Sequence, residues 1–114
     1  MSLIYKLLDR PAWDAALAQG VFNGSAVDLA DGFIHFSTAA QAAEAARRHF
    51  SGQANLVLVA VEAEALGAAL RWEPSRGGDL VPHLYGPLPT AAAMSVRPLM
   101  LGPDGAPDLG ELGS

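Results

Sequence analysis

The chain has 114 residues, of which 51% are hydrophobic and 17% are charged, enough apolar material for one folded domain and too little length for a second. It has no cysteine, which excludes disulfides, thiolate metal sites and a cysteine nucleophile. With 7 basic and 12 acidic side chains the net charge is -5, which opposes broad binding to nucleic acid or to an anionic membrane. Because the N-terminus lacks an export pattern and no apolar run is long enough to span a bilayer, we expect a cytoplasmic protein that does not bind membranes.

The chain begins with a predicted strand followed by a helix. Residues 3–8 are mostly apolar, and the helix begins around Pro11, since proline suits a first turn whose amides lack partners. Trp13 and Leu17 share the helical face expected to meet the core, and Gly20 is well placed to end the helix.

Turn-forming residues then lead to a short strand over residues 32–36 and to a second helix. Ser37 or Thr38 caps this helix, because Thr38 and Gln41 have the spacing of a capping box. The alanine-rich stretch that follows predicts a helix as far as Phe50.

The second half of the chain predicts a series of strands. Residues 56–61 form an unbroken apolar run, typical of a central strand covered on both faces. Pro82 predicts that its strand lies at a sheet edge or is interrupted, because proline cannot donate to a ladder. Pro98 likewise breaks the last strand. Further strands are expected over residues 70–73, 80–85 and 96–101, with a turn at 75–78.

These elements predict an α+β fold. Two helices of the N-terminal half would pack on a mainly antiparallel sheet of about five or six short strands, either continuous or split. We expect one globular domain over residues 1–101. Residues 102–114 are rich in glycine, proline and acidic side chains, with Leu109 and Leu112 too isolated to join a core, so a flexible tail is expected there.

The histidines are the first candidates for chemistry. Alternation puts Phe33 and His35 on one strand face, and His83 and Tyr85 on one face of a later strand. If both faces line one cleft, imidazole can donate to a ribose or phosphate oxygen or move a proton. Partly buried histidines satisfied by backbone groups are the structural alternative. The spacing does not match a helical zinc site, so no metal site is predicted.

A second candidate lies between Arg71 and Asp79. Arg71 and Arg76 suit anion binding, Trp72 offers a stacking surface, and Gly77 exposes backbone amides. Glu73 adds a carboxylate. A plain hairpin turn with a solvent-facing strand is an equally good interpretation.

Two further sets of candidate residues have a simpler structural interpretation. Asp28 and Asp31 precede Gly32 and invite a paired-carboxylate site, but turn formation explains both more simply. Ser37 follows His35 by two residues and is a candidate substrate-binding residue, while capping the next helix is its structural alternative.

Six blocks of residues lie along the chain: Ile4-Tyr5-Lys6, Gly24-Ser25, Asp28, Asp31-Gly32-Phe33-Ile34-His35-Phe36-Ser37, Arg71-Trp72-Glu73 and Pro82-His83-Leu84-Tyr85-Gly86. In residue type and spacing they resemble the bacterial DUF 952 family, for which no activity is assigned. The resemblance extends over roughly residues 3 to 100.

This family in turn resembles the ADP-ribosyltransferase superfamily and the RNA 2'-phosphotransferases in overall fold. The resemblance implies that His35 contacts a ribose and that Trp72, His83 and Tyr85 line the cleft. It also implies NAD as a substrate, while no glutamate motif of the superfamily is matched, which leaves Glu73 as a candidate by chemistry alone.

The resulting hypothesis is a nucleotide-sized site of an ADP-ribosyl or phosphoryl transferase. His35, His83 and Glu73 are its candidate catalytic residues. Its candidate substrate-binding residues are Ser37, Arg71, Trp72, Arg76, Gly77 and Tyr85. The alternative is a non-enzymatic domain that binds a small ligand or a protein partner with the same face.

Overall fold

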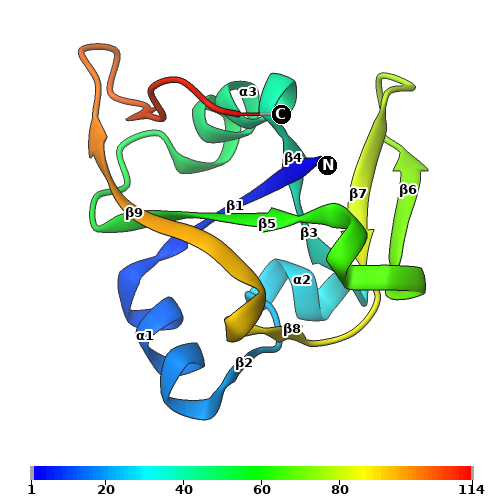
Figure 1. Ribbon diagram of the computed structural model, residues 1–114. Coiled ribbons are helices and arrows are strands. Elements are labelled where there is room, and N and C mark those ends of the chain that lie inside the picture. The colour runs from blue at the N-terminus through cyan, green and yellow to red at the C-terminus, as the bar shows by residue number, and fades with distance from the viewer. Residues whose placement is uncertain (1, 114) are drawn as a thin grey trace.

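Strand β5 (Leu56–Glu62) lies at the centre of the fold, as its unbroken apolar sequence predicts. The computed structural model, which describes residues 2–113, pairs β5 with β1 (Leu3–Asp9) on one side and with β9 (Ala93–Leu101) on the other (Figure 1). The short strands β4 (Ser37–Thr38) and β10 (Pro107–Asp108) complete a five-stranded antiparallel sheet in the order β10-β9-β5-β1-β4.

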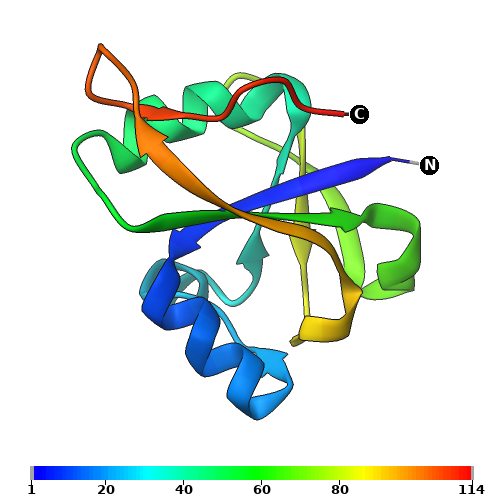
Figure 2. The same ribbon diagram turned by 60° about the vertical axis from the view of Figure 1, so that its left-hand side comes forward.

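Hydrophobic cores lie on both faces of this sheet. Helix α1 (Arg10–Gln19) contributes Trp13 and Ala16 to the first core, and helix α3 (Ala39–Phe50) contributes Ala42 and Ala46 to the second. Figures 1 and 2 show these helices on opposite sides of the sheet. Alternate residues of β5 enter the two cores: Val57, Val59 and Val61 the first, Leu56, Leu58 and Ala60 the second. The predicted α+β class is therefore confirmed, and so is the central position of β5.

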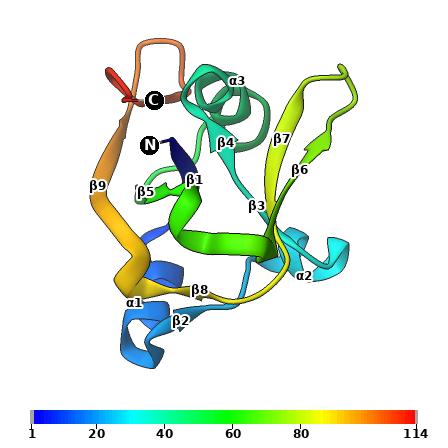
Figure 3. The ribbon, with the colours of Figure 1, turned by 45° about the vertical axis from the view of Figure 1, so that its right-hand side comes forward.

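A second, three-stranded antiparallel sheet stands beside the first. Its order is β3 (Ile34–His35), β7 (Leu80–Leu84) and β6 (Leu70–Pro74). Figure 3 shows the β6–β7 hairpin projecting along the side of the molecule. Pro82 predicts an edge strand or an interrupted one. The first alternative is wrong, because β7 lies between β3 and β6, and β7 itself is continuous from Leu80 to Leu84, while its ladder with β3 ends next to Pro82. Proline is tolerated because β3 is only two residues long and pairs with β7 beyond Pro82.

Both predicted helices have the expected boundaries. Gly20 ends α1 with φ 82°, a left-handed conformation that suits glycine, and Thr38 and Gln41 form the predicted capping box of α3. Leu17, however, is 53% exposed, so its assignment to the core was wrong and Trp13 anchors α1.

The region expected to be a loop contains a further helix, α2 (Ala26–Asp31). Ser25 caps it, and Asp28 completes the capping box from the first turn. The other short elements are β2 (Val21–Phe22), which pairs with β8 (Leu88–Pro89), and the 3₁₀ helices η1 (Ala63–Ala69) and η2 (Thr90–Ala92). Within residues 2–113 no helix has the length and apolar character needed to cross a membrane.

The end of the chain packs on the sheet. Strand β9 runs through Pro98 without a break, contrary to the prediction. Within residues 2–113, β9 pairs on the side away from β5 only with β10, at Met100 and Leu101, so no ladder on that side needs an amide from Pro98. Strand β10 then brings Leu109 onto the second core, where it is 5% exposed. The expectation that Leu109 is too isolated to join a core was therefore wrong.

Candidate functional site

Six side chains meet on one face of the three-stranded sheet, and we call this group the histidine face. Strand pairing creates it: His35 of β3 lies directly opposite His83 of β7, which lies directly opposite Arg71 of β6. The ring centroids of the two histidines are 5.5 Å apart. The histidine face consists of Phe33, His35, Arg71, Glu73, His83 and Tyr85.

His35 is held by two carboxylates of α2. Its Nδ1 lies 2.6 Å from Asp28 Oδ1, and its Nε2 lies 2.9 Å from Asp31 Oδ2. The His35 backbone amide also donates to Asp28 Oδ1. The imidazole is thus fixed in orientation, while its side chain stays 34% exposed.

Behind His35 lies a buried ion pair. Lys6 Nζ is 2.9 Å from Asp28 Oδ2, and it also donates to the His35 carbonyl oxygen at 3.0 Å. Burial lowers the pKa of Lys6, with Asp28 acting in the opposite direction. Burial alone would raise the pKa of Asp28, but the Lys6 charge, together with the Ser25 amide and His35, lowers it to about 2. Asp28 is therefore ionised and accepts the hydrogen on His35 Nδ1.

This pKa predicts how acid acts on the fold. Because the pKa of Asp28 is lower in the folded chain than its ordinary value of 3.8, the carboxylate stabilises the fold fully above that value. This contribution is lost as the pH falls from 3.8 towards about 2. Urea unfolding midpoints across this interval should fall more steeply for the wild type than for Asp28→Asn. Parallel pH dependences of the two proteins would contradict the assignment.

The second histidine has a carboxylate of its own. His83 Nδ1 and Tyr85 Oη both lie 2.7 Å from Glu73 Oε1. Hydrogen bonds from Tyr85 and His83 lower the pKa of Glu73, and the bond to Glu73 raises the pKa of Tyr85. The Arg71 guanidinium lies 4.9 Å from the centre of the Tyr85 ring, a cation–π distance that leaves its N–H groups free to meet an anion from solvent.

Phe33 lies at the centre of the face. Its ring stacks on His83 with centroids 4.0 Å apart, and it lies 4.6 Å from His35 and 5.2 Å from Tyr85. Phe33 therefore links the two carboxylate–histidine pairs.

The structure brings together some of the predicted site residues and separates others. His35, Arg71, Glu73, His83 and Tyr85 meet on the histidine face. The remaining four lie away from this face: Ser37, Trp72, Arg76 and Gly77.

Trp72 lies between Arg71 and Glu73 in β6, so alternation turns it to the other face of the sheet, where it is 42% exposed. Arg76 and Gly77 lie in the turn at the tip of the β6–β7 hairpin. Ser37 lies in β4, paired with Tyr5 of the main sheet.

Sequence reasoning missed Lys6 and the roles of Asp28 and Asp31. The turn interpretation of Asp28 was only partly correct, because this side chain caps α2 and also binds Lys6 and His35. Two signals were available. A lysine among the apolar residues of the first strand requires a buried partner, and Ser25 with Asp28 has capping-box spacing.

A pocket of about 330 Å³ adjoins the histidine face. Phe33 and Asp28 belong to both the pocket and the site. Its other lining residues come from the segments around α2 and after β7: Asn23, Leu29, Gly32, Ile34, Leu84, Gly86 and Pro87. A cavity of this volume lies at the lower end of the range for small-molecule sites.

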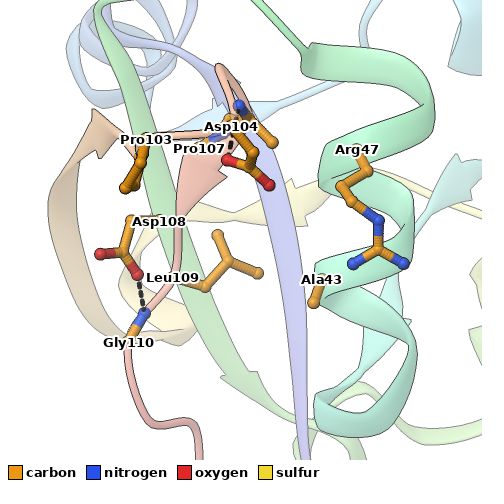
Figure 4. Close-up of a pocket in the computed structure, with 10 residues that line it drawn as sticks. Ala43, Arg47, Pro103, Asp104, Pro107, Asp108, Leu109 and Gly110 are labelled. Atoms are coloured by element: carbon orange, nitrogen blue, oxygen red, sulfur yellow. Dashed lines mark hydrogen bonds between the residues drawn. The ribbon is translucent and has the colours of Figure 1, made fainter.

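A larger pocket of about 430 Å³ lies between α3 and the C-terminal segment, away from both histidines (Figure 4). Ala43 and Arg47 face it from α3. Its acidic side chains are used locally: Asp104 accepts from the Ala106 amide and Asp108 from the Gly110 amide. We therefore place the candidate site at the histidine face. The smaller pocket lies beside this face and shares Phe33 with it, while His35 and His83 are not among the residues that line the pocket.

Across the described part of the chain, histidine, aspartate and glutamate side chains form no group of three arranged to hold a metal ion.

The comparisons with known proteins agree with one another. The family model described as a protein of unknown function (DUF952) matches residues 7–96. A crystal structure of the protein CC0527 from Caulobacter crescentus is 60% identical over 95% of both chains, with a TM-score of 0.93. A solution NMR structure of CC0527 is 61% identical over 96% of this chain and 95% of that one, with a TM-score of 0.87. The comparison with curated proteins gives no match.

Proposed function

Since the chain belongs to the DUF952 family, whose description assigns no activity, we propose a function from the site itself. The histidine face binds a nucleotide-sized ligand through ribose and phosphate groups, and it serves an ADP-ribosyltransferase-like or phosphotransferase-like reaction. The observation that carries this proposal is the pair of carboxylate-anchored histidines, His35 and His83, next to a pocket of about 330 Å³.

His35 is the ribose-contacting residue of this proposal. A buried carboxylate on Nδ1 fixes the orientation of the ring. A ligand hydroxyl that binds Nε2 takes the place of the exposed Asp31 carboxylate there. The resemblance of the family to the ADP-ribosyltransferases and RNA 2'-phosphotransferases supports the same role, because a strand histidine contacts the ribose in those proteins. NAD and ADP-ribose are accordingly the first ligands to test.

Arg71 is the phosphate-binding residue of the proposal. It is exposed, and the Tyr85 ring beneath it holds the guanidinium on the histidine face. Arg76 and Gly77 extend the anion-binding region only for a ligand long enough to reach the hairpin tip. Glu73 orients His83, since Oε1 already accepts hydrogen bonds from His83 and Tyr85.

A non-enzymatic binding domain is the second candidate, and one observation favours it. Val27 and Leu29 of α2 are 62% and 67% exposed, and Leu29 lines the pocket. An apolar helix surface beside a pocket suits a protein or small-ligand partner.

A thermal-shift panel tests the proposal with NAD, ADP-ribose, mononucleotides and phosphate. A ligand at 100 times its Kd should stabilise the wild type by about 2.7 kcal/mol, because it binds only the folded state. The shift should disappear in His35→Gln and persist in the control His49→Gln, since His49 is exposed at the end of α3. If no ligand shifts the melting temperature of the wild type, the nucleotide site is rejected.

A further inference from the structure

The arrangement of the two histidines points to a particular chemistry. We propose that His35 and His83 form a general acid–base pair that opens a cyclic phosphodiester monoanion, such as a nucleoside 2',3'-cyclic phosphate, with water. This inference rests on the nucleotide-sized site proposed above and selects phosphoryl chemistry for it.

The geometry of the rings is the first argument. The two histidines face each other across neighbouring antiparallel strands, with an angle of 72° between the ring planes. In each ring Nδ1 lies on a carboxylate oxygen, at 2.6 Å for His35 and at 2.7 Å for His83. This contact fixes the hydrogen of a neutral ring on Nδ1 and makes Nε2 the nitrogen that takes up a proton. Displacement at phosphorus needs two such groups, one for the entering oxygen and one for the leaving oxygen.

The surroundings of the rings differ, and this difference assigns the roles. His35 meets a carboxylate at both nitrogens, Asp28 and Asp31, so each of its nitrogens has an acceptor for a hydrogen. His83 meets one carboxylate, Glu73, whose Oε1 also accepts from Tyr85. His35 is therefore the general acid and His83 the general base.

The charges of the histidine face favour a singly charged ligand. Arg71 is its exposed cation, whereas Lys6 is buried behind His35 and donates to Asp28. The carboxylates of Glu73 and Asp31 lie beside the imidazoles and repel a polyphosphate. A phosphodiester carries one negative charge, which matches one guanidinium.

The pocket supplies a place for the nucleoside. Phe33 lines the pocket of about 330 Å³ and stacks on His83 at 4.0 Å, so this one ring borders both the pocket and the histidine face. Leu29 and Pro87 offer apolar walls, and Asn23 offers polar groups for a base edge.

The reaction balances with water as the only co-reactant. The water oxygen forms a bond to phosphorus while His83 Nε2 takes its proton. The 2' or 3' ribose oxygen takes the place of the exposed Asp31 carboxylate at His35 Nε2. The bond from phosphorus to that oxygen breaks, and the oxygen receives the proton from His35 Nε2. The product is a nucleoside monophosphate, and exchange with solvent returns each histidine to its starting state.

The test uses the full chain and adenosine 2',3'-cyclic phosphate, with the product followed by phosphorus NMR. We expect ring opening by the wild type, a loss of about 10²- to 10⁴-fold in kcat/KM for His35→Gln and for His83→Gln, and full activity for the control His49→Gln. Circular dichroism verifies that each variant is folded.

The dependence of kcat/KM on pH separates catalysis from a structural role. It should be bell-shaped for the wild type, because one histidine must be neutral and the other protonated. The limb at low pH should disappear in His83→Gln and the limb at high pH in His35→Gln. The titratable and charged groups that face the pair are Asp28, Asp31, Arg71, Glu73 and Tyr85, with Lys6 behind Asp28.

Three negative results would each reject a different part of the two proposals. If chemical shifts show that the cyclic phosphate binds at the histidine face but no product forms, the acid–base pair is rejected and the nucleotide site stands. If NAD or ADP-ribose stabilises the protein while the cyclic phosphate does not bind, the substrate class is rejected. Absence of binding by any of them rejects the proposed function as well.

Discussion

Replacing Asp28 by asparagine should lower the free energy of unfolding by about 3–5 kcal/mol, because it leaves the buried Lys6 ammonium without its counter-charge. Both partners are nearly inaccessible: the Lys6 side chain is 9% exposed and that of Asp28 2%. Asparagine has the size of aspartate, so the lost free energy of unfolding measures the contribution of the Asp28 charge and of the hydrogen bonds that it accepts from Lys6 and His35. Urea unfolding followed by circular dichroism measures it.

Two control variants test whether this loss of stability comes from the buried Lys6–Asp28 pair. The double variant Lys6→Met with Asp28→Asn should recover much of the loss, since no unpaired charge stays buried. Glu44→Gln removes an exposed carboxylate that pairs with Arg47 and Arg48 on α3, and it should change the stability by less than about 0.5 kcal/mol. A loss for Asp28→Asn as small as that for Glu44→Gln would contradict the buried pair.

Truncating Leu109 to alanine should cost about 2–4 kcal/mol, as expected for a leucine removed from a packed core. Leu109 packs in the second core, and its carbonyl oxygen accepts a hydrogen bond from Arg97 of β9. The same urea titration measures the loss.

Leu101→Ala is the matched control, because Leu101 lies in β9 but is 42% exposed. It should change the stability by less than about 0.5 kcal/mol. Equal, small effects at Leu101 and Leu109 would favour the flexible tail predicted from composition for residues 102–114.

Local sequence signals predicted much of the fold. The apolar run of β5, the capping box at Thr38 and the glycine at the end of α1 each have a nearby physical cause, and each lies where expected. Contacts between distant segments were harder to foresee. Leu109 is buried only because β10 returns to β9, and nothing in residues 102–114 alone indicates that pairing.

The errors at Leu17 and Pro82 have the same origin. Helical periodicity places Leu17 on the same face as Trp13. How much of that face is buried depends on the tertiary fold, which covers Trp13 and leaves Leu17 exposed. The proline rule for Pro82 depends on how long the neighbouring strand is, and β3 ends after two residues.

The candidate site was partly predictable. Strand alternation placed Phe33 with His35 and His83 with Tyr85, and the pairing of β3 with β7 brings these sets together. Alternation also turns Trp72 to the opposite face of β6, although its ring, which offers a stacking surface, makes it a candidate for the site.

The sequence carries separate local signals for Lys6 and for Asp28, but none for their meeting at His35, because β1 and α2 are distant in the chain and the sequence predicts a loop where α2 lies. Only the tertiary structure brings Lys6, Asp28 and His35 together.

The two histidines belong to different parts of the fold. His35 contacts α2 and β1, whereas His83 lies on the β6–β7 hairpin with Glu73. The two parts are joined by the two-residue β3–β7 ladder, by hydrogen bonds from Phe36 to Pro82 and from the Gln41 side chain to Leu80, by the stack of Phe33 on His83 and by Leu84 in the first core. A molecule that touches both imidazoles adds one more contact between these parts, so we expect amide hydrogen exchange in the hairpin to be slower in the bound protein than in the free one.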